Sequence, residues 1–299
     1  MVNEAQFFHV AITREYLVSN VLDTKVIFLS MRMPAFNSRY FELIKLDGSP
    51  LGSIKKGKLD NCYLYYKIRS LEPKASMVIS STVFLKRKED AFFPKIKDLG
   101  QINEIARGNK VLSYLRDSSE YITRRVRKIA QRFLKKTNDL QEIEHQLMAF
   151  LTRNFRKVET HGEDPFLVFQ RKYASPVDLA IAFILLNISM GVPARLVEGL
   201  LLNQAEKNLR EHYWCEILSS KGWIPYDPWL NLEGMISLAH IPIKIENPFR
   251  RFPNIKIRYK VVKRTSRKAI RIIENGIKIR SFMDGAIITL ERNVEKIVY

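Results

Sequence analysis

A long apolar segment followed by three short strands is the feature that most constrains this fold. Residues 176–190 are apolar on nearly all sides, which predicts a helix buried at the centre of its domain. Strands are expected next at about 194–202, 211–217 and 222–226. A buried helix that precedes an antiparallel sheet is typical of an α+β domain.

Four fragments of this region carry a resemblance to a known family. In chain order they are Ser175–Ala180 (SPVDLA), Gly191–Arg195 (GVPAR), His212–Glu216 (HYWCE) and Gly222–Pro228 (GWIPYDP). They resemble the core of the transglutaminase-like superfamily, in which a Cys opens a helix and a His and an Asp lie on the following strands. The resemblance covers about residues 110–235 and implies a papain-like fold.

The resemblance also implies a Cys–His–Asp triad, with His212 as the general base and Asp227 orienting its imidazole. Aligned without a gap, the Cys position falls on Pro176, which has no group that can attack a carbonyl carbon. Ser175 is one residue away, about 100° around a helix. Ser175, Pro176 and Asp178 instead fit the N-cap, first and third positions of a helix. We therefore predict a pseudoenzyme with vestigial His212 and Asp227, no metal and no cofactor.

The two cysteines are not expected to replace the missing nucleophile. Cys215 would point away from His212 because neighbouring residues on a strand face opposite sides. Cys62 lies on a predicted aromatic strand far upstream, and both thiols are interpreted as packing residues. Trp214 and Trp223 are expected to pack around the His–Asp pair and, with Ser175, to line what remains of the groove.

Composition and charge indicate a basic globular protein that binds a polyanion. The 299 residues include 50 Lys and Arg but only 31 Asp and Glu, which gives a formal net charge of +19. Such a chain attracts nucleic acid, an anionic membrane surface or an acidic partner. The two cysteines and the N-terminal sequence predict a cytoplasmic protein, and the many Ile, Lys and Arg residues favour a thermophilic source. Polar residues interrupt the apolar stretch 179–202, so no membrane span is expected.

Three consecutive parts are predicted. Residues 1–100 read as an antiparallel β-sandwich, with strands at about 7–17, 25–33, 40–46, 62–68 and 76–86. Residues 101–240 form the transglutaminase-like core, which opens with a helix capped near 117–120 and a second helix at about 139–154. Residues 241–299 form a basic, β-rich C-terminal extension.

The C-terminal part holds much of the excess charge. Residues 244–280 include 13 Lys or Arg and 2 Glu. Strict alternation in residues 255–261 predicts a strand with its cations on one face. Such a strip next to Phe249, Phe252 and Tyr259 could follow a phosphate backbone while a ring stacks on a base. The predicted nucleic-acid-binding residues are Lys256, Arg258, Lys260, Lys263, Arg264, Arg267 and Lys268. The alternative is a lysine-rich edge strand that resists aggregation.

Three functions are compatible with these features. The first is a catalytically inactive transglutaminase-like protein that binds nucleic acid or another polyanion through its basic C-terminal surface. The second is a scaffold whose degenerate groove holds a protein partner. The third is an active amide hydrolase or acyltransferase with a non-standard nucleophile, such as Ser175.

Overall fold

The structure is a computed structural model that describes residues 9–94, 98–102, 105, 120–159, 164–203, 205–206, 208–249, 256–262, 270–283 and 286–298. The chain forms two compact units. Unit 1 comprises residues 1–88, 201–210 and 252–299, and unit 2 comprises residues 89–200 and 211–251. Within the described residues, no helix combines the length and apolarity needed to cross a bilayer.

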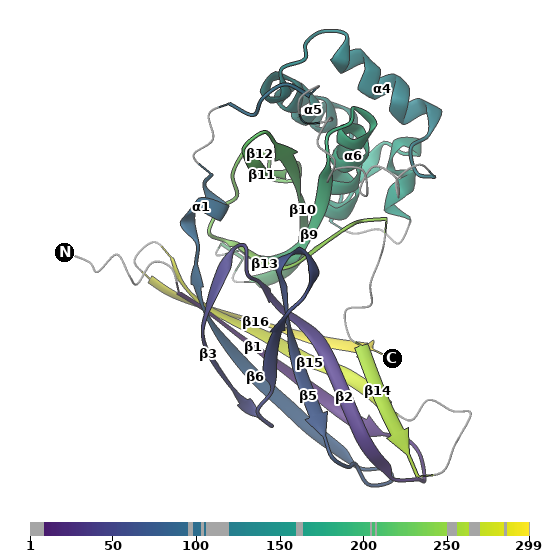
Figure 1. The fold of residues 1–299 in the computed structure, drawn as a ribbon, viewed down its shortest axis with the longest axis vertical. Coiled ribbons are helices and arrows are strands. Elements are labelled where there is room, and N and C mark those ends of the chain that lie inside the picture. The colour runs from purple at the N-terminus through teal and green to yellow at the C-terminus, as the bar shows by residue number, and fades with distance from the viewer. Residues whose placement is uncertain are drawn as a thin grey trace, which may run out of the picture. The chain divides into compact units, whose positions relative to one another are not determined.

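Unit 1 is built from two antiparallel sheets (Figure 1). One sheet has the strand order β16-β15-β1-β6-β3, and the other has the order β14-β2-β5-β4. The core-facing positions are large and apolar, as on β2, where Leu29, Met31 and Met33 are fully buried. The strands are β1 (His9–Asn20), β2 (Val26–Asn37), β3 (Phe41–Ser49), β4 (Ser53–Lys56), β5 (Asn61–Ile68), β6 (Ser76–Arg87), β14 (Lys256–Val261), β15 (Ile270–Met283) and β16 (Ala286–Val298), with a 3-10 turn η2 (Lys58–Asp60) before β5.

The C-terminal strands pair with the N-terminal ones. Strand β15 is hydrogen-bonded to β1, and β14 is hydrogen-bonded to β2. Residues 252–299 therefore belong to unit 1, and residues 241–251 belong to unit 2, where the sequence suggested a separate extension over 241–299. The physical reason is that β1 and β2 would otherwise expose unpaired backbone groups along one side.

Unit 2 combines helices with a second antiparallel sheet. The sheet order is β12-β11-β10-β9-β13, and a short parallel pair joins β7 to β8. The helices are α1 (Glu89–Phe92), α4 (Arg124–Leu134), α5 (Leu140–Asn154) and α6 (Pro176–Ser189), with a 3-10 helix η4 (Pro165–Gln170). The strands are β7 (Arg156–Lys157), β8 (Tyr173–Ala174), β9 (Ala194–Asn203), β10 (Asn208–Ser219), β11 (Gly222–Asp227), β12 (Leu232–Glu233) and β13 (His240–Glu246).

Helix α6 lies at the centre of the core of unit 2. Almost all its side chains are buried, including the polar ones of Asp178 and Asn187. It begins at Pro176 with Ser175 as its N-cap, where the sequence predicted a helix start. An all-round apolar surface requires neighbours on every side, and α4, α5 and η4 all contact it.

Helix α4 begins later than its predicted cap. Its N-cap is Thr123, whose Oγ1 accepts a hydrogen bond from the backbone N–H of Val126 at 3.3 Å. Most of the capping signature at 117–120 lies outside the described residues. The buried residues of α4, Val126, Ala130 and Phe133, recur at helical spacing and so lie on one face.

Candidate functional site

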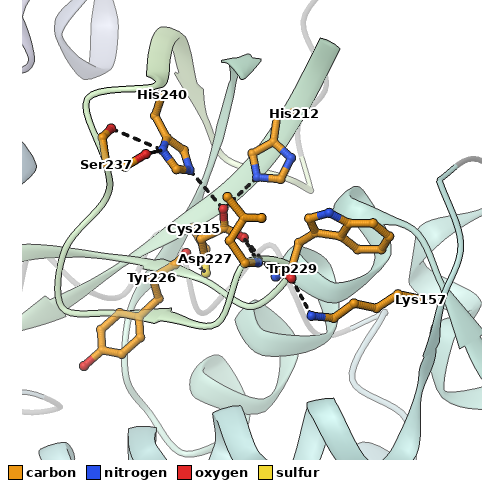
Figure 2. Close-up of polar contacts among 9 residues, drawn as sticks. Lys157, His212, Cys215, Tyr226, Asp227, Trp229, Ser237 and His240 are labelled. Carbon is orange, nitrogen blue, oxygen red and sulfur yellow. Dashed lines mark hydrogen bonds and ion pairs between the residues drawn. The ribbon is translucent and has the colours of Figure 1, made fainter. Parts of the chain in front are cut away.

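Asp227, at the end of β11, accepts four hydrogen bonds (Figure 2). Its Oδ2 accepts from Nε2 of His212 on β10 at 2.7 Å and from Nε2 of His240 on β13 at 3.0 Å. Its Oδ1 accepts from the backbone N–H groups of Trp229 and Leu230 at 2.9 and 3.1 Å. The carboxylate is fully buried, and every lone pair that a carboxylate offers has a donor.

The two imidazoles determine the charge of this carboxyl. Burial alone would raise the pKa of Asp227, but the hydrogen bonds from His212 and His240 more than offset burial and hold that pKa well below its usual range. Burial lowers the pKa of His240, although the Asp227 carboxylate opposes this shift. A neutral His240 can donate from Nε2 to Asp227 and accept at Nδ1 from Ser237 Oγ, which lies 2.9 Å away. The cluster is thus satisfied with one negative charge on Asp227.

His240 belongs to this cluster although no motif marks it. It lies after the last of the four sequence fragments, at the start of a strand that is buried along its whole length. Strand β13 pairs at the far side of β9, so its neighbours are set by sheet order and not by sequence spacing. Nothing in the sequence distinguishes His240 from an ordinary core histidine.

Trp214 packs on the two histidines as predicted, whereas Trp223 lies elsewhere. The Trp214 ring centroid is 6.0 Å from that of His212 and 5.0 Å from that of His240. A Cβ at position 199 would come within 2.6 Å of the Trp214 ring, so a glycine is needed there. Trp214 is 0% exposed and therefore does not line an open groove in this structure.

Trp223 covers a buried ion pair. The guanidinium of Arg195 lies 3.9 Å from the Trp223 ring centroid, and Arg195 Nε donates to Glu216 Oε2 at 2.6 Å. Trp223 is therefore a packing partner of Arg195 and not of the His–Asp pair. Both Trp223 and Asp227 are on β11, but they are four positions apart, which is about 13 Å along a strand.

The hydroxyl of Ser175 is bonded within the start of helix α6. Ser175 Oγ and its backbone N–H both donate to Asp178 Oδ2, at 2.6 and 2.7 Å. Arg171 donates to the other oxygen of Asp178 at 3.1 Å. This arrangement is that of a helix cap, in which an acid in the first turn accepts from the N-cap residue.

Both thiols are buried and neither lies with the histidines. Cys215 is on β10 but in the core that surrounds α6, and its Sγ donates to the carbonyl of Tyr226 at 3.3 Å. Burial raises the pKa of the Cys215 thiol well above its usual value. Cys62 belongs to β5 in unit 1, and burial raises the pKa of its thiol too. Both side chains are expected to stay protonated at neutral pH, the form that does not act as a nucleophile.

Comparison with known proteins agrees with this arrangement of helix and strands. Residues 127–228 match the transglutaminase-like superfamily. This region is a transglutaminase-like domain. A search of curated protein sequences gave no significant match.

A solved structure shares the fold at low sequence identity. A candidate cysteine protease from Cytophaga hutchinsonii superposes with a TM-score of 0.59 at 11% identity, over 96% of this chain and 98% of that protein. A candidate protease from Parabacteroides distasonis has a TM-score of 0.31 at 13% identity, over 70% and 42% of the two chains. A TGase structure has a TM-score of 0.30 at 14% identity, over 64% and 47%. The first of these shows a common fold, α+β with a papain-like core, and the other two similarities are too low to add to it.

Unit 2 contains one set of groups, among its described residues, with the composition of a metal site. The ligand atoms of His212, Asp227 and His240 lie within 4.8 Å of one another. A tetrahedral zinc site with bonds of 2.0–2.1 Å would hold its ligands about 3.3 Å apart. The two N–O separations of 2.7 and 3.0 Å are shorter and match hydrogen bonds. Hydrogen bonding therefore accounts for the cluster without an ion.

A cavity of about 690 Å³ in unit 2 lies away from these groups. Its polar lining includes Asp139, Glu142, His145 and Glu233, and its apolar lining includes Tyr226. Tyr226 and Asp227 are neighbours on β11 and so point to opposite sides of the sheet. The predicted groove residues Ser175, Trp214 and Trp223 do not line this cavity.

A second buried acid lies between α5 and α6. Glu144 Oε2 accepts a hydrogen bond from Asn187 Nδ2 at 3.1 Å, and burial raises the pKa of Glu144 to about 8. Within the described part of the chain, Glu144 Oε1 and Asn187 Oδ1 have no hydrogen-bond partner. A protonated Glu144 carboxyl can donate to the Asn187 carbonyl, which would close an acid–amide pair. No pattern in the sequence set this glutamate apart from its exposed neighbours.

The structure places only part of the predicted cationic strip. Lys256, Arg258 and Lys260 are exposed on β14, an edge strand, whereas Lys263, Arg264, Arg267 and Lys268 lie outside the described residues. Phe252 also lies outside the described residues. Phe249 is half-buried in the core of unit 2, where its ring packs on those of Tyr121 and Phe166 at 5.3 and 5.6 Å. Phe249 is therefore a packing residue and not a free stacking surface.

Proposed function

We propose that this chain is a non-catalytic transglutaminase-like protein that binds a polyanion, foremost nucleic acid, through the cations of β14. The observation that supports the lack of catalysis is the pairing of Ser175 Oγ with Asp178 at the start of α6, which engages the hydroxyl next to the expected nucleophile position, Pro176. A scaffold without chemistry can retain its buried hydrogen bonds because they stabilise the fold.

The alternative is a hydrolase, since the Cytophaga hutchinsonii neighbour is named as a candidate cysteine protease. Such an enzyme needs a nucleophile beside the base and a thiol or hydroxyl free to ionise. Cys215 is fully buried with a raised pKa, and Ser175 donates to a carboxylate. A serine- or thiol-directed fluorescent probe tests this alternative. We expect no labelling of the wild type; labelling that disappears in His212→Ala would replace the proposal with an active enzyme.

Exposed and unmatched charge supports polyanion binding. Lys256, Arg258 and Lys260 alternate with half-buried or apolar residues, so all three cations project from one side of β14. None of the three forms an ion pair with any residue that the structure describes. Phosphate groups would supply the missing counter-charges and release condensed cations on binding.

Fluorescence anisotropy with labelled single-stranded DNA, duplex DNA and RNA over a range of salt concentrations tests the proposal. We expect binding that weakens steeply with salt, and a clear loss in the triple variant Lys256→Gln, Arg258→Gln, Lys260→Gln. A matched control removes three exposed cations from α4, by Arg125→Gln, Arg127→Gln and Lys128→Gln. Equal losses of affinity in the two variants would mean that only the net charge of the protein matters. If none of the three ligands bound near physiological salt, the proposal would be rejected.

A further inference from the structure

The sheet β14-β2-β5-β4 joins the cations of β14 to others from the N-terminal strands. Lys256 pairs with Arg32, Arg258 with Ser30 and Lys260 with Phe28. On the next strand, Arg32 pairs with Tyr65 and Ser30 with Lys67, and Lys55 on β4 pairs with Tyr63. Directly paired residues share one side of a sheet. We name this side the cationic sheet face; its residues are Phe28, Ser30, Arg32, Ser53, Lys55, Tyr63, Tyr65, Lys67, Lys256, Arg258 and Lys260.

The opposite side of the same sheet packs in the core of unit 1, so the cationic sheet face points away from that core. Leu29, Met31 and Met33 on β2, and Leu64 and Tyr66 on β5, are all at most 1% exposed. A slip of one residue in register would bury the cations and expose these side chains. Figure 1 shows β14, β2 and β5 side by side in this sheet. The face is therefore built from strands about two hundred residues apart in the chain.

Charge on this face is of one sign. It contains six cations and no Asp or Glu. Within the described ranges, none of the six takes part in an ion pair, and Arg32 Nε is buried with no hydrogen-bond acceptor. Cations that lie side by side without acids repel one another, so this grouping costs the fold electrostatic energy. An anionic ligand would remove that cost.

Aromatic rings lie among the cations. The guanidinium of Arg32 is 4.5 Å above the centre of the Tyr63 ring, and Lys55 Nζ is 5.4 Å from that of Tyr65. Phe28 is 40% exposed next to Lys260. Rings and guanidinium planes of this kind stack on nucleobases, while neighbouring cations contact phosphates. A duplex hides the faces of its bases within its own stack, whereas a single strand exposes them.

We infer that the cationic sheet face binds single-stranded nucleic acid, with bases stacked on Phe28, Tyr65 and the Arg32–Tyr63 pair and phosphates held by the surrounding cations. The inference rests on the proposed polyanion binding and adds to it the class of ligand and the surface. An acidic protein partner would be attracted by the charge alone and would not require the rings.

The first experiment uses the wild-type chain and three labelled ligands of equal length. They are an oligothymidine of about 20 nucleotides, an abasic strand with the same phosphates, and a duplex. We expect the oligothymidine to bind about tenfold or more tightly than the abasic strand, because stacking requires bases. Equal affinity for the oligothymidine and the abasic strand would overturn the inference and leave polyanion binding intact. No binding of any ligand would reject both.

The second experiment removes two of the three stacking positions without changing charge. In the double variant Phe28→Ala, Tyr65→Leu, which keeps the Arg32–Tyr63 pair, we expect the preference for oligothymidine over the abasic strand to fall severalfold while affinity for the abasic strand stays unchanged. The control is Tyr259→Leu on the other side of β14, which should keep the preference. Loss of the preference in Tyr259→Leu but not in the double variant would show that a different surface stacks the bases.

Discussion

The His212–Asp227–His240 cluster and the cationic sheet face are both groups of polar side chains, but their partners differ. In the cluster, four donors meet the four acceptor positions of one buried carboxylate. On the sheet face, six cations lie together without an acid; five of them are exposed and Arg32 is half-buried. Polar groups that satisfy one another inside a protein are explained by stability alone. Charges that remain unmatched on one surface are better explained by a ligand.

The largest effect is expected from changing the carboxylate of Asp227. In Asp227→Asn, one oxygen can accept from only two of the four donors, so the amide nitrogen faces the others and two buried N–H groups lose their acceptor. We expect the free energy of unfolding to fall by roughly 3–5 kcal/mol. Urea denaturation at pH 7 measures it.

Asp23→Asn is the matched control, because the Asp23 side chain is 92% exposed and should be nearly neutral to stability. A loss in Asp227→Asn no larger than in Asp23→Asn would contradict the view that this cluster stabilises the fold. If Asp227→Asn were stable but no longer bound nucleic acid, the binding surface would instead include the cluster.

Sequence alone predicts the central helix and the strands that carry His212 and Asp227, but it does not predict that His240 joins their polar cluster. Helix α6, its Ser175–Pro176 start and the strands that carry His212 and Asp227 follow from local apolar patterns and capping chemistry. His240 does not, because β13 reaches the site through sheet order. A local pattern carries no information about which distant strands will pair.

The same limit applies to the sheet face. The alternation of Lys256, Arg258 and Lys260 predicts one cationic side of a strand. It does not predict that Arg32 and Lys67 will extend that side, because β14 pairs with β2, a strand far away in the sequence. The one-sided charge could be found from sequence, whereas the aromatic rings beside it could not.

The second largest effect concerns the buried Glu144 and depends on pH. Its pKa is raised from 4.5 to about 8, so its contribution to stability is fully present below pH 4.5 and is lost as pH rises towards 8. Glu144→Gln cannot ionise and can still pair with Asn187. We expect the variant to match the wild type at pH 4.5 and to be more stable by roughly 4 kcal/mol at pH 8.

Thermal melts at a series of pH values measure this difference. Glu142→Gln on the exposed side of α5 is the control and should leave the pH profile of the wild type unchanged. If Glu144→Gln were less stable than the wild type at pH 8, the carboxylate would have a favourable partner in the folded state, and the buried acid–amide pair would be the wrong description.

The smallest effect would sharpen the comparison most, because it separates function from stability on the sheet face. Arg258 lies between Lys256 and Lys260 along β14 and beside Ser30, and Lys67 follows on the next strand. Removing its charge in Arg258→Gln relieves repulsion, so we expect Tm to rise by about 1 °C while affinity for single-stranded DNA falls. The slope of log affinity against log salt should decrease by about 0.7, the value for one phosphate contact on a single strand.

A paired surface cation such as Lys45, bonded to Asp47, is the control and should behave in the opposite way. Lys45→Gln should lower Tm slightly and leave the affinity for single-stranded DNA unchanged. If both variants lost stability and neither lost affinity, the cations of the face would be ordinary surface charge, and the contrast with the buried cluster would no longer point to a ligand.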